Sequence, residues 1–232
     1  MVKNHLKTLA APKTWAIKRK SQVFLVRPAP GAHPKDECLP LRIIMADILK
    51  YGRTSKEIKY IINNRNVLID GMRRKSLKFN VGVMDTVQVP DLNEYYRVIF
   101  NKKGKIDLVA IGKDEADMKI CKIINKSMVS GRTQLNLDDG KNILADKGAK
   151  GSYGVGDSLL LHLPDQKILE LLKLEKGAAV YLKKGKYAGQ TGVVEGIKED
   201  TINIRSEAGS IQTLKAYALV IGKDKPLLTV TK

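Results

Sequence analysis

Seven basic side chains between positions 53 and 75 have the chemistry and the spacing to bind phosphate groups. They are Arg53, Lys56, Lys59, Arg65, Arg73, Arg74 and Lys75. Only two acids, Glu57 and Asp70, lie in the same stretch, and Tyr60 adds an amphipathic ring. Lys and Arg neutralise the phosphates of nucleic acids without any covalent step. The pattern therefore predicts a surface that binds a polyanion.

Two helices are predicted to hold part of this surface. Residues 41–49 place apolar side chains at helical spacing, and residues 54–57 read T-x-x-E, a capping box that begins a second helix. Ile58, Ile61 and Ile62 form the buried side of the second helix. The cations of that helix and Tyr60 then share its opposite, exposed side.

A short hairpin is predicted to hold the remaining cations. Residues 67–69 and 72–74 flank Asp70-Gly71, a dipeptide that supplies the positive φ angles of a type I′ turn. Arg73, Arg74 and Lys75 leave that turn together. Two packed helices and a hairpin form a rigid support, so the cations are expected at fixed positions.

The whole chain carries a large positive charge. Its 232 residues hold 42 Lys and Arg against 24 Asp and Glu, a net charge of +18, and 43% of the residues are hydrophobic. Such an excess predicts a polyanionic partner, either nucleic acid or an acidic membrane. No apolar run reaches the length of a membrane span, and two distant cysteines suit a reducing compartment. We expect a soluble, cytoplasmic protein.

Residues 1–35 carry eight of the basic residues and no acid. Prolines at 28, 30 and 34 disfavour a helix or a central strand near the end of this segment. We expect an arm that orders only against RNA and leaves Trp15 exposed in the free protein. Its candidate RNA-binding residues are Lys3, His5, Lys7, Lys13, Trp15, Lys18, Arg19, Lys20, Arg27 and His33.

The rest of the chain is predicted to be β structure. Residues 95–100 and 105–111 alternate around a Lys-Lys-Gly turn, and strands are expected at 118–129, 133–137 and 142–144. Between 176 and 197, glycines at 185, 189, 192 and 196 are typical of sharp turns in a small barrel. The exposed first loop of that barrel holds Lys183, Lys184, Lys186 and Tyr187 as candidate RNA-binding residues.

Catalytic and cofactor-binding patterns are missing from the sequence. No Gly-Lys pair is followed by Ser or Thr, so there is no P-loop. His5, His33 and His162 lie in three different segments, which gives neither a metal site nor a catalytic triad. We therefore expect a protein that is not an enzyme, with no catalytic residues, no metal and no cofactor.

The chain resembles the archaeal and eukaryotic small-subunit ribosomal protein family "S-four-e". The resemblance rests on ECLPLRIIMADILKYGRTSKEIKYIINNRNVLIDGMRRKSLKFNVGVMD at 37–85, which looks like an alpha-L RNA-binding motif, together with HLKTLAAPKTW and RPAPGAHPK upstream. KGAAVYLKKGKYAGQTGVVEGI is similar to a KOW motif. The resemblance implies an α+β, mostly β fold: a basic extension (1–36), an alpha-L domain with two helices and a hairpin (37–90), a central antiparallel β domain (91–170), and a C-terminal SH3-like KOW barrel with its tail (171–232).

The same resemblance implies a structural constituent of the small ribosomal subunit that binds small-subunit rRNA and supports its folding and translation. The expected partners are that rRNA and other small-subunit ribosomal proteins, with no membrane, no small-molecule substrate and no homo-oligomer. Two rival functions stay open. A pseudouridine-synthase-like rRNA-modifying enzyme would need a catalytic Asp, but Gly131-Arg132-Thr133-Gln134 offers no carboxylate. A KOW-type transcription factor would not account for the alpha-L residues or the basic arm.

Overall fold

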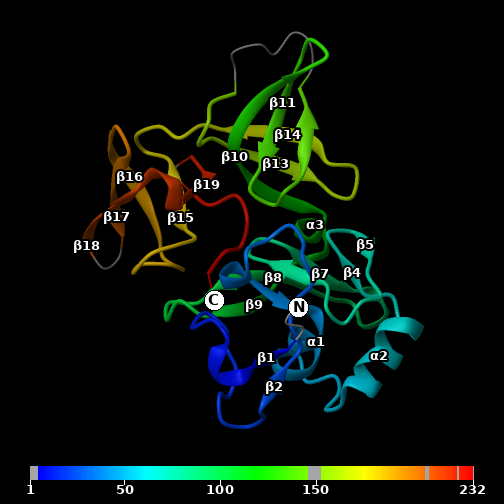
Figure 1. Ribbon diagram of the computed structural model, residues 1–232. Helices are drawn as coiled ribbons and strands as arrows, with labels where there is room; N and C mark the ends of the chain where they lie inside the picture. The colour runs from blue at the N-terminus through cyan, green and yellow to red at the C-terminus, as the bar shows by residue number, and fades with distance from the viewer. Residues whose placement is uncertain (1–4, 146–152, 207–208, 224, 232) are drawn as a thin grey trace. The chain divides into compact units, whose positions relative to one another are not determined.

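The computed structural model describes residues 5–145, 153–206, 209–223 and 225–231, and its chain divides into two compact units (Figure 1). The first unit comprises Met1–Ile99 and Lys105–Ala116, and the second comprises Phe100–Gly104 and Asp117–Lys232. Both are rich in antiparallel strands with few helices. The predicted α+β, mostly β class is confirmed. No helix among the described residues is long and apolar enough to cross a membrane.

A five-stranded sheet forms the centre of the first unit. Its strand order is β5-β4-β7-β8-β9. The bounds are β4 Leu68–Ile69, β5 Met72–Arg73, β7 Thr86–Val89, β8 Glu94–Phe100 and β9 Ile106–Ala110. The sequence predicted the β8–β9 hairpin as part of a central domain. The hairpin instead belongs to this sheet, because β8 pairs with β7. Local alternation predicts a strand, whereas the choice of a neighbouring strand depends on packing far away in the sequence.

The helices of the first unit follow their sequence signals. Helix α1 (Leu41–Ile43) continues directly as a π-helical turn, η3 (Ile44–Ile48), whose apolar side is buried. Helix α2 (Ser55–Asn64) begins with the predicted capping box: the Thr54 hydroxyl accepts from the Glu57 N–H at 3.2 Å, and the Glu57 carboxylate accepts from the Thr54 N–H. The first unit also contains a one-turn helix, α3 (Lys113–Ala116), and short 3-10 turns at Thr8–Ala10, Lys35–Glu37 and Pro90–Leu92.

The N-terminal segment is folded, contrary to the expected arm. Strand β1 (Leu6–Lys7) pairs with β2 (Phe24–Leu25), and β3 (Cys38–Pro40) pairs with β6 (Asn80–Gly82). Trp15 is 1% exposed, forms a β-bridge with Ile106, and donates its indole N–H to the Lys35 carbonyl at 3.2 Å. Burying one large ring on the sheet stabilises a segment whose composition alone suggests disorder.

The second unit contains two five-stranded antiparallel sheets. The first has the order β12-β11-β10-β13-β14, and its inner face buries Cys121, Ile123, Leu135 and Leu159. Its strands are β10 Met118–Val129, β11 Arg132–Leu137, β12 Asn142–Leu144, β13 Ser158–His162 and β14 Lys167–Leu172. The three strands predicted between 118 and 144 are confirmed.

The other sheet of the second unit has the order β18-β17-β16-β15-β19. Its strands are β15 Ala179–Leu182, β16 Thr191–Lys198, β17 Thr201–Ser206, β18 Gly209–Leu214 and β19 Ala218–Gly222, with a 3-10 turn at Lys215–Tyr217. Gly189 adopts φ +90°, as predicted for a turn glycine. Gly192 has no positive φ, but a Cβ there would lie 2.5 Å from the Arg205 carbonyl oxygen, so close backbone approach requires this glycine.

Candidate nucleic-acid interface

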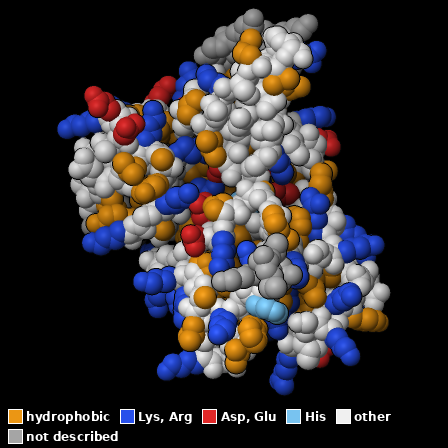
Figure 2. All heavy atoms as spheres, in the orientation of Figure 1, with side chains coloured by type: hydrophobic (Ala, Val, Ile, Leu, Met, Phe, Trp, Pro, Cys, Tyr) orange, Lys and Arg blue, Asp and Glu red, His pale blue; other side chains and the backbone are white. Residues whose placement is uncertain are grey.

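Helix α2 presents a cationic face to solvent. Ile58 and Ile62 are fully buried, whereas Lys56, Lys59 and Tyr60 on the other side are exposed, Tyr60 by 70%. Figure 2 shows Lys and Arg side chains gathered over α2 and the β4–β5 hairpin. In the described part of the chain, Lys56 and Lys59 make no ion pair. Their positive charge is therefore exposed to solvent.

The acid beside this face belongs to the helix cap. The Glu57 carboxylate accepts from the Arg53 N–H at 2.9 Å and from the Thr54 N–H at 3.3 Å. These backbone hydrogen bonds lower the pKa of Glu57, so its charge is held at the helix N-terminus. The capping geometry thus fixes the start of the helix that carries Lys56 and Lys59 in its first two turns.

The hairpin cations divide into supporting and exposed residues. Arg73 donates to the Asn63 carbonyl at 2.7 Å, which ties β5 to the end of α2. The Arg74 guanidinium lies 4.6 Å from the ring centroid of Phe79. Lys75 is exposed, and Arg65 approaches Asp91 at 3.9 Å. Arg73 and Arg74 therefore position the hairpin as well as adding charge.

The N-terminal candidates lie in different environments. Five cations are exposed: Lys7, Lys13, Lys18, Lys20 and Arg27. Arg19 instead donates to the carbonyls of Ala11 and Pro12, at 3.1 and 2.8 Å. His5 is exposed beside Phe24, with ring centroids 5.7 Å apart, and Lys3 lies outside the described residues. Trp15 belongs to the core, so its inclusion among the exposed RNA-binding residues is corrected.

His33 is also a core residue, contrary to its predicted role. Its Nε2 lies 3.1 Å from Asp85, and both side chains are only 4% exposed. Asp85 accepts in addition from the Gly82 N–H at 2.7 Å. A Cβ at Gly82 would lie 2.1 Å from the His33 ring, so the ring fills the space that the glycine leaves. His33 therefore joins the RPAPGAHPK segment to the sheet, and its side chain is buried.

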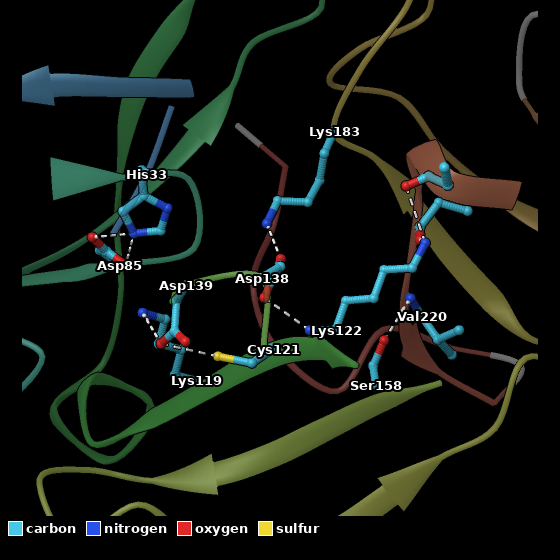
Figure 3. A network of polar contacts seen from close by, with 12 residues as sticks. His33, Asp85, Lys119, Cys121, Lys122, Asp138, Asp139, Ser158, Lys183 and Val220 are labelled. Carbon is cyan, nitrogen blue, oxygen red and sulfur yellow. Dashed lines mark hydrogen bonds and ion pairs between the residues drawn. The ribbon is translucent and has the colours of Figure 1, made fainter. Parts of the chain in front are cut away.

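Lys183 is the third candidate that the structure removes from the surface. It is 8% exposed and its ammonium group pairs with the Asp138 carboxylate (Figure 3). Asp138 also accepts from the Lys122 N–H at 2.9 Å. Lys184 and Lys186 in the same loop are exposed, and the Lys186 ammonium lies 5.5 Å from the Tyr187 ring centroid. These two lysines remain as the cations of this loop that face solvent.

Sequence reasoning missed a buried lysine in the same network. The Lys122 ammonium donates to the carbonyls of Lys215, Ala216 and Ala218 at 2.8, 3.0 and 2.7 Å. Burial lowers the pKa of Lys122 to about 8. Its position between the apolar residues Cys121 and Ile123 was the signal that could have indicated its burial.

Metal chemistry has no support in the described residues. No group of three or more His, Cys, Asp or Glu side chains there could hold a metal ion. The arrangement consists instead of exposed cations on folded supports, which suits phosphate binding.

Known proteins resemble this chain over nearly its whole length. The model of "Ribosomal family S4e" matches residues 92–168, and that of the "RS4NT (NUC023) domain" matches residues 2–36. A small ribosomal subunit protein eS4 from Methanocaldococcus jannaschii is 42% identical over 97% of both chains. One from Methanosphaera stadtmanae is 38% identical over 98% of this chain and 96% of its own. The crystal structure of the 30S ribosomal protein S4e from Thermoplasma acidophilum matches with a TM-score of 0.69 and 33% identity, over 82% of this chain and 97% of that one.

Proposed function

Because the chain belongs to the ribosomal family S4e, we propose that it is a structural constituent of the small ribosomal subunit. In this role it binds small-subunit rRNA and supports the folding of that RNA and translation. The names of its relatives and its net charge of +18 support this function. Its partners are small-subunit rRNA and neighbouring ribosomal proteins in the cytoplasm, and it acts without forming a homo-oligomer.

The exposed cationic face of α2 is the observation that carries this proposal. Lys56, Lys59 and Lys75 stand on a capped helix and a tight hairpin, so little side-chain support must be reorganised when RNA binds. Arg53, Arg65 and Tyr60 extend the same surface. We assign this surface to an alpha-L RNA-binding domain at 37–90, which follows a basic extension at 1–36.

A second RNA contact is proposed for the C-terminal part, 171–232, as a KOW-type SH3-like barrel. Lys184, Lys186 and Tyr187 lie in the loop between β15 and β16, and two of them are exposed lysines. The remaining exposed cations of the N-terminal extension, together with His5, add sequence-independent contacts to phosphates.

A structural role is favoured over catalysis. The relatives are named as ribosomal proteins, and neither rival function has support among them. His33 pairs with Asp85, but both side chains are only 4% exposed, so a substrate has little access to them. We therefore propose no enzymatic activity, no metal and no cofactor.

Salt-dependent binding to small-subunit rRNA tests the proposed α2 face. We expect Lys56→Gln and Lys59→Gln each to weaken binding and to lower the slope of log affinity against log salt by roughly 0.7 to 0.9. Their melting temperatures should stay close to the wild type, because both side chains are exposed. Lys198→Gln is the matched control, an exposed lysine followed by Glu199 and Asp200. Equal slopes for the wild type and both α2 variants would refute the assignment of this face to RNA.

A further inference from the structure

The ribbon of β1 and β2 buries one side and exposes the other. Side chains on a strand point alternately to its two sides, and residues that are opposite in an antiparallel pair point to the same side. Leu6 lies opposite Leu25, and both are buried, at 5% and 7% exposed. Lys7 lies opposite Phe24, so these two side chains point the other way, and both are exposed. His5, two residues before Lys7, shares this outer side.

Two aromatic rings lie next to each other on this outer side. The ring centroids of His5 and Phe24 are 5.7 Å apart, and the ring planes are tilted by 53°. Phe24 is 54% exposed, and His5 is exposed as well. A phenylalanine ring usually stabilises a protein by being buried, so much of that stabilisation is absent in the free chain. The exposed ring is therefore free to stabilise a complex by contact with a ligand.

The apolar surface continues at the end of the ribbon on a fixed backbone. Val23 is 68% exposed and Leu9 is 76% exposed. The buried Thr8 holds this backbone, because its N–H donates to the Val23 carbonyl at 2.9 Å and its hydroxyl donates to the Gln22 carbonyl at 2.5 Å. Apolar side chains that are exposed together favour a binding site, and a fixed backbone lowers the cost of ordering on binding.

The charge around these rings favours nucleic acid over protein. Residues 1–35 carry eight Lys and Arg and no acid. Lys7 is directly opposite Phe24, and Lys20 is exposed four residues before that ring. An RNA strand offers flat base faces to aromatic rings and phosphates to the neighbouring cations. A base inside a duplex is already stacked on both faces, so the rings suit an unpaired nucleotide.

We propose that His5, Lys7 and Phe24 form a stacking platform for an unpaired nucleotide of small-subunit rRNA. The Phe24 ring stacks on the base, His5 extends the aromatic surface, and Lys7 neutralises a neighbouring phosphate. The inference rests on the proposed rRNA-binding function and adds a base contact to the phosphate contacts of the N-terminal extension. Every base has an aromatic face, so the platform distinguishes unpaired from paired RNA and not one base from another.

Substitution of Phe24 in the full-length protein separates stacking from charge. We expect Phe24→Leu, which keeps an apolar side chain but removes the ring, to weaken binding to small-subunit rRNA about fivefold or more. The slope of log affinity against log salt should stay the same, because no charge is lost. Phe24→Tyr keeps the ring and should bind like the wild type. Leu169→Ala is the control, at a leucine that is 53% exposed beside Glu170 in the second unit, and should also bind like the wild type.

Two oligonucleotides identify the base contact. A short single-stranded oligouridine should bind Phe24→Leu more weakly than the wild type, whereas its duplex with oligoadenine should bind both proteins equally. Emission from Trp15, which is buried in the same segment, shows whether that segment is still folded in the variant. If the emission shifts, His5→Gln, which leaves Phe24 in place, is tested by the same criteria.

The outcomes separate this inference from the proposed function. A wild type that fails to bind the rRNA would refute the proposed function itself. If the wild type binds and Phe24→Leu binds equally well, the stacking platform is wrong and the function stands. An equal loss on single strand and duplex, or an equal loss from Leu169→Ala, would also overturn the platform. If Phe24→Leu impaired incorporation into small subunits but left rRNA affinity unchanged, the partner of this surface would be a neighbouring protein instead.

Discussion

Trp15 reports on the N-terminal segment by itself, because it is the only tryptophan in the chain. Its ring is 1% exposed and its indole N–H is bonded to the Lys35 carbonyl. We therefore expect blue-shifted emission in the RNA-free protein and a shift to longer wavelength when urea unfolds the first unit. Added rRNA should change the emission little. Emission at solvent-exposed wavelengths, readily quenched by iodide before any urea is added, would contradict the docked segment.

Gly189 and Gly196 form a matched pair of glycines in one sheet region. Gly189 has φ +90° and a Cβ there would meet the Asn101 carbonyl, whereas a Cβ at Gly196 would meet nothing within 4 Å. We expect Gly189→Ala to lower the free energy of unfolding by about 1 kcal/mol or more. Gly196→Ala should stay within about 0.5 kcal/mol of the wild type. Thermal melts followed by circular dichroism compare the two, and equal melting temperatures would exclude the close approach.

At the scale of elements, Lys122 joins the strand β10 to the turn that precedes β19. Its ammonium donates to three carbonyls between 215 and 218, which would lose a donor in Lys122→Met. We expect this variant to be destabilised by about 1 to 3 kcal/mol at neutral pH. Lys126→Met, at an exposed position of the same strand, is the control. Urea unfolding curves give both values, and equal stabilities would show that the buried ammonium has no stabilising role.

The lowered pKa of Lys122 also gives this contact a pH dependence. Burial shifts the pKa from 10.5 to about 8 in the folded protein, so between these values the unfolded chain holds more protons on this side chain. Its contribution to the unfolding free energy is therefore fully present above about pH 10.5 and is lost as the pH falls through 8. The stability difference between wild type and Lys122→Met should grow from pH 7.5 to 9.5. A constant difference over that range would contradict the shift.

Helix caps and turns that depend on neighbouring residues were predicted from the sequence. Contacts between residues far apart in the sequence were not predicted. The Thr54–Glu57 cap and the Asp70-Gly71 turn depend on neighbouring residues, and both have the expected geometry. The docking of Trp15 and the pair of His33 with Asp85 depend on contacts 91 and 52 residues away in sequence. The spacing of apolar residues along the sequence does not indicate such long-range contacts. The exposed cations of α2 were predictable for the same local reason.

At the scale of the whole chain, three candidate residues are buried, whereas most of the described candidate lysines are exposed. Trp15, His33 and Lys183 serve the interior, where each has a specific partner. The exposed lysines of α2 and of the second unit instead keep their charge at the surface. Because the chain has a net charge of +18, most of its basic side chains must lie where solvent or a polyanion reaches them.

Crosslinking within small ribosomal subunits that contain this chain tests the central claim most directly. Ultraviolet irradiation followed by mass spectrometry maps the crosslinked residue and nucleotide together. We predict crosslinks from the exposed face of α2, at Lys56, Lys59 or Tyr60, to small-subunit rRNA. Buried Lys119 and Tyr181 serve as internal controls that should not crosslink. The account would be contradicted if the chain were absent from purified small subunits, or if the α2 face were crosslinked only to protein.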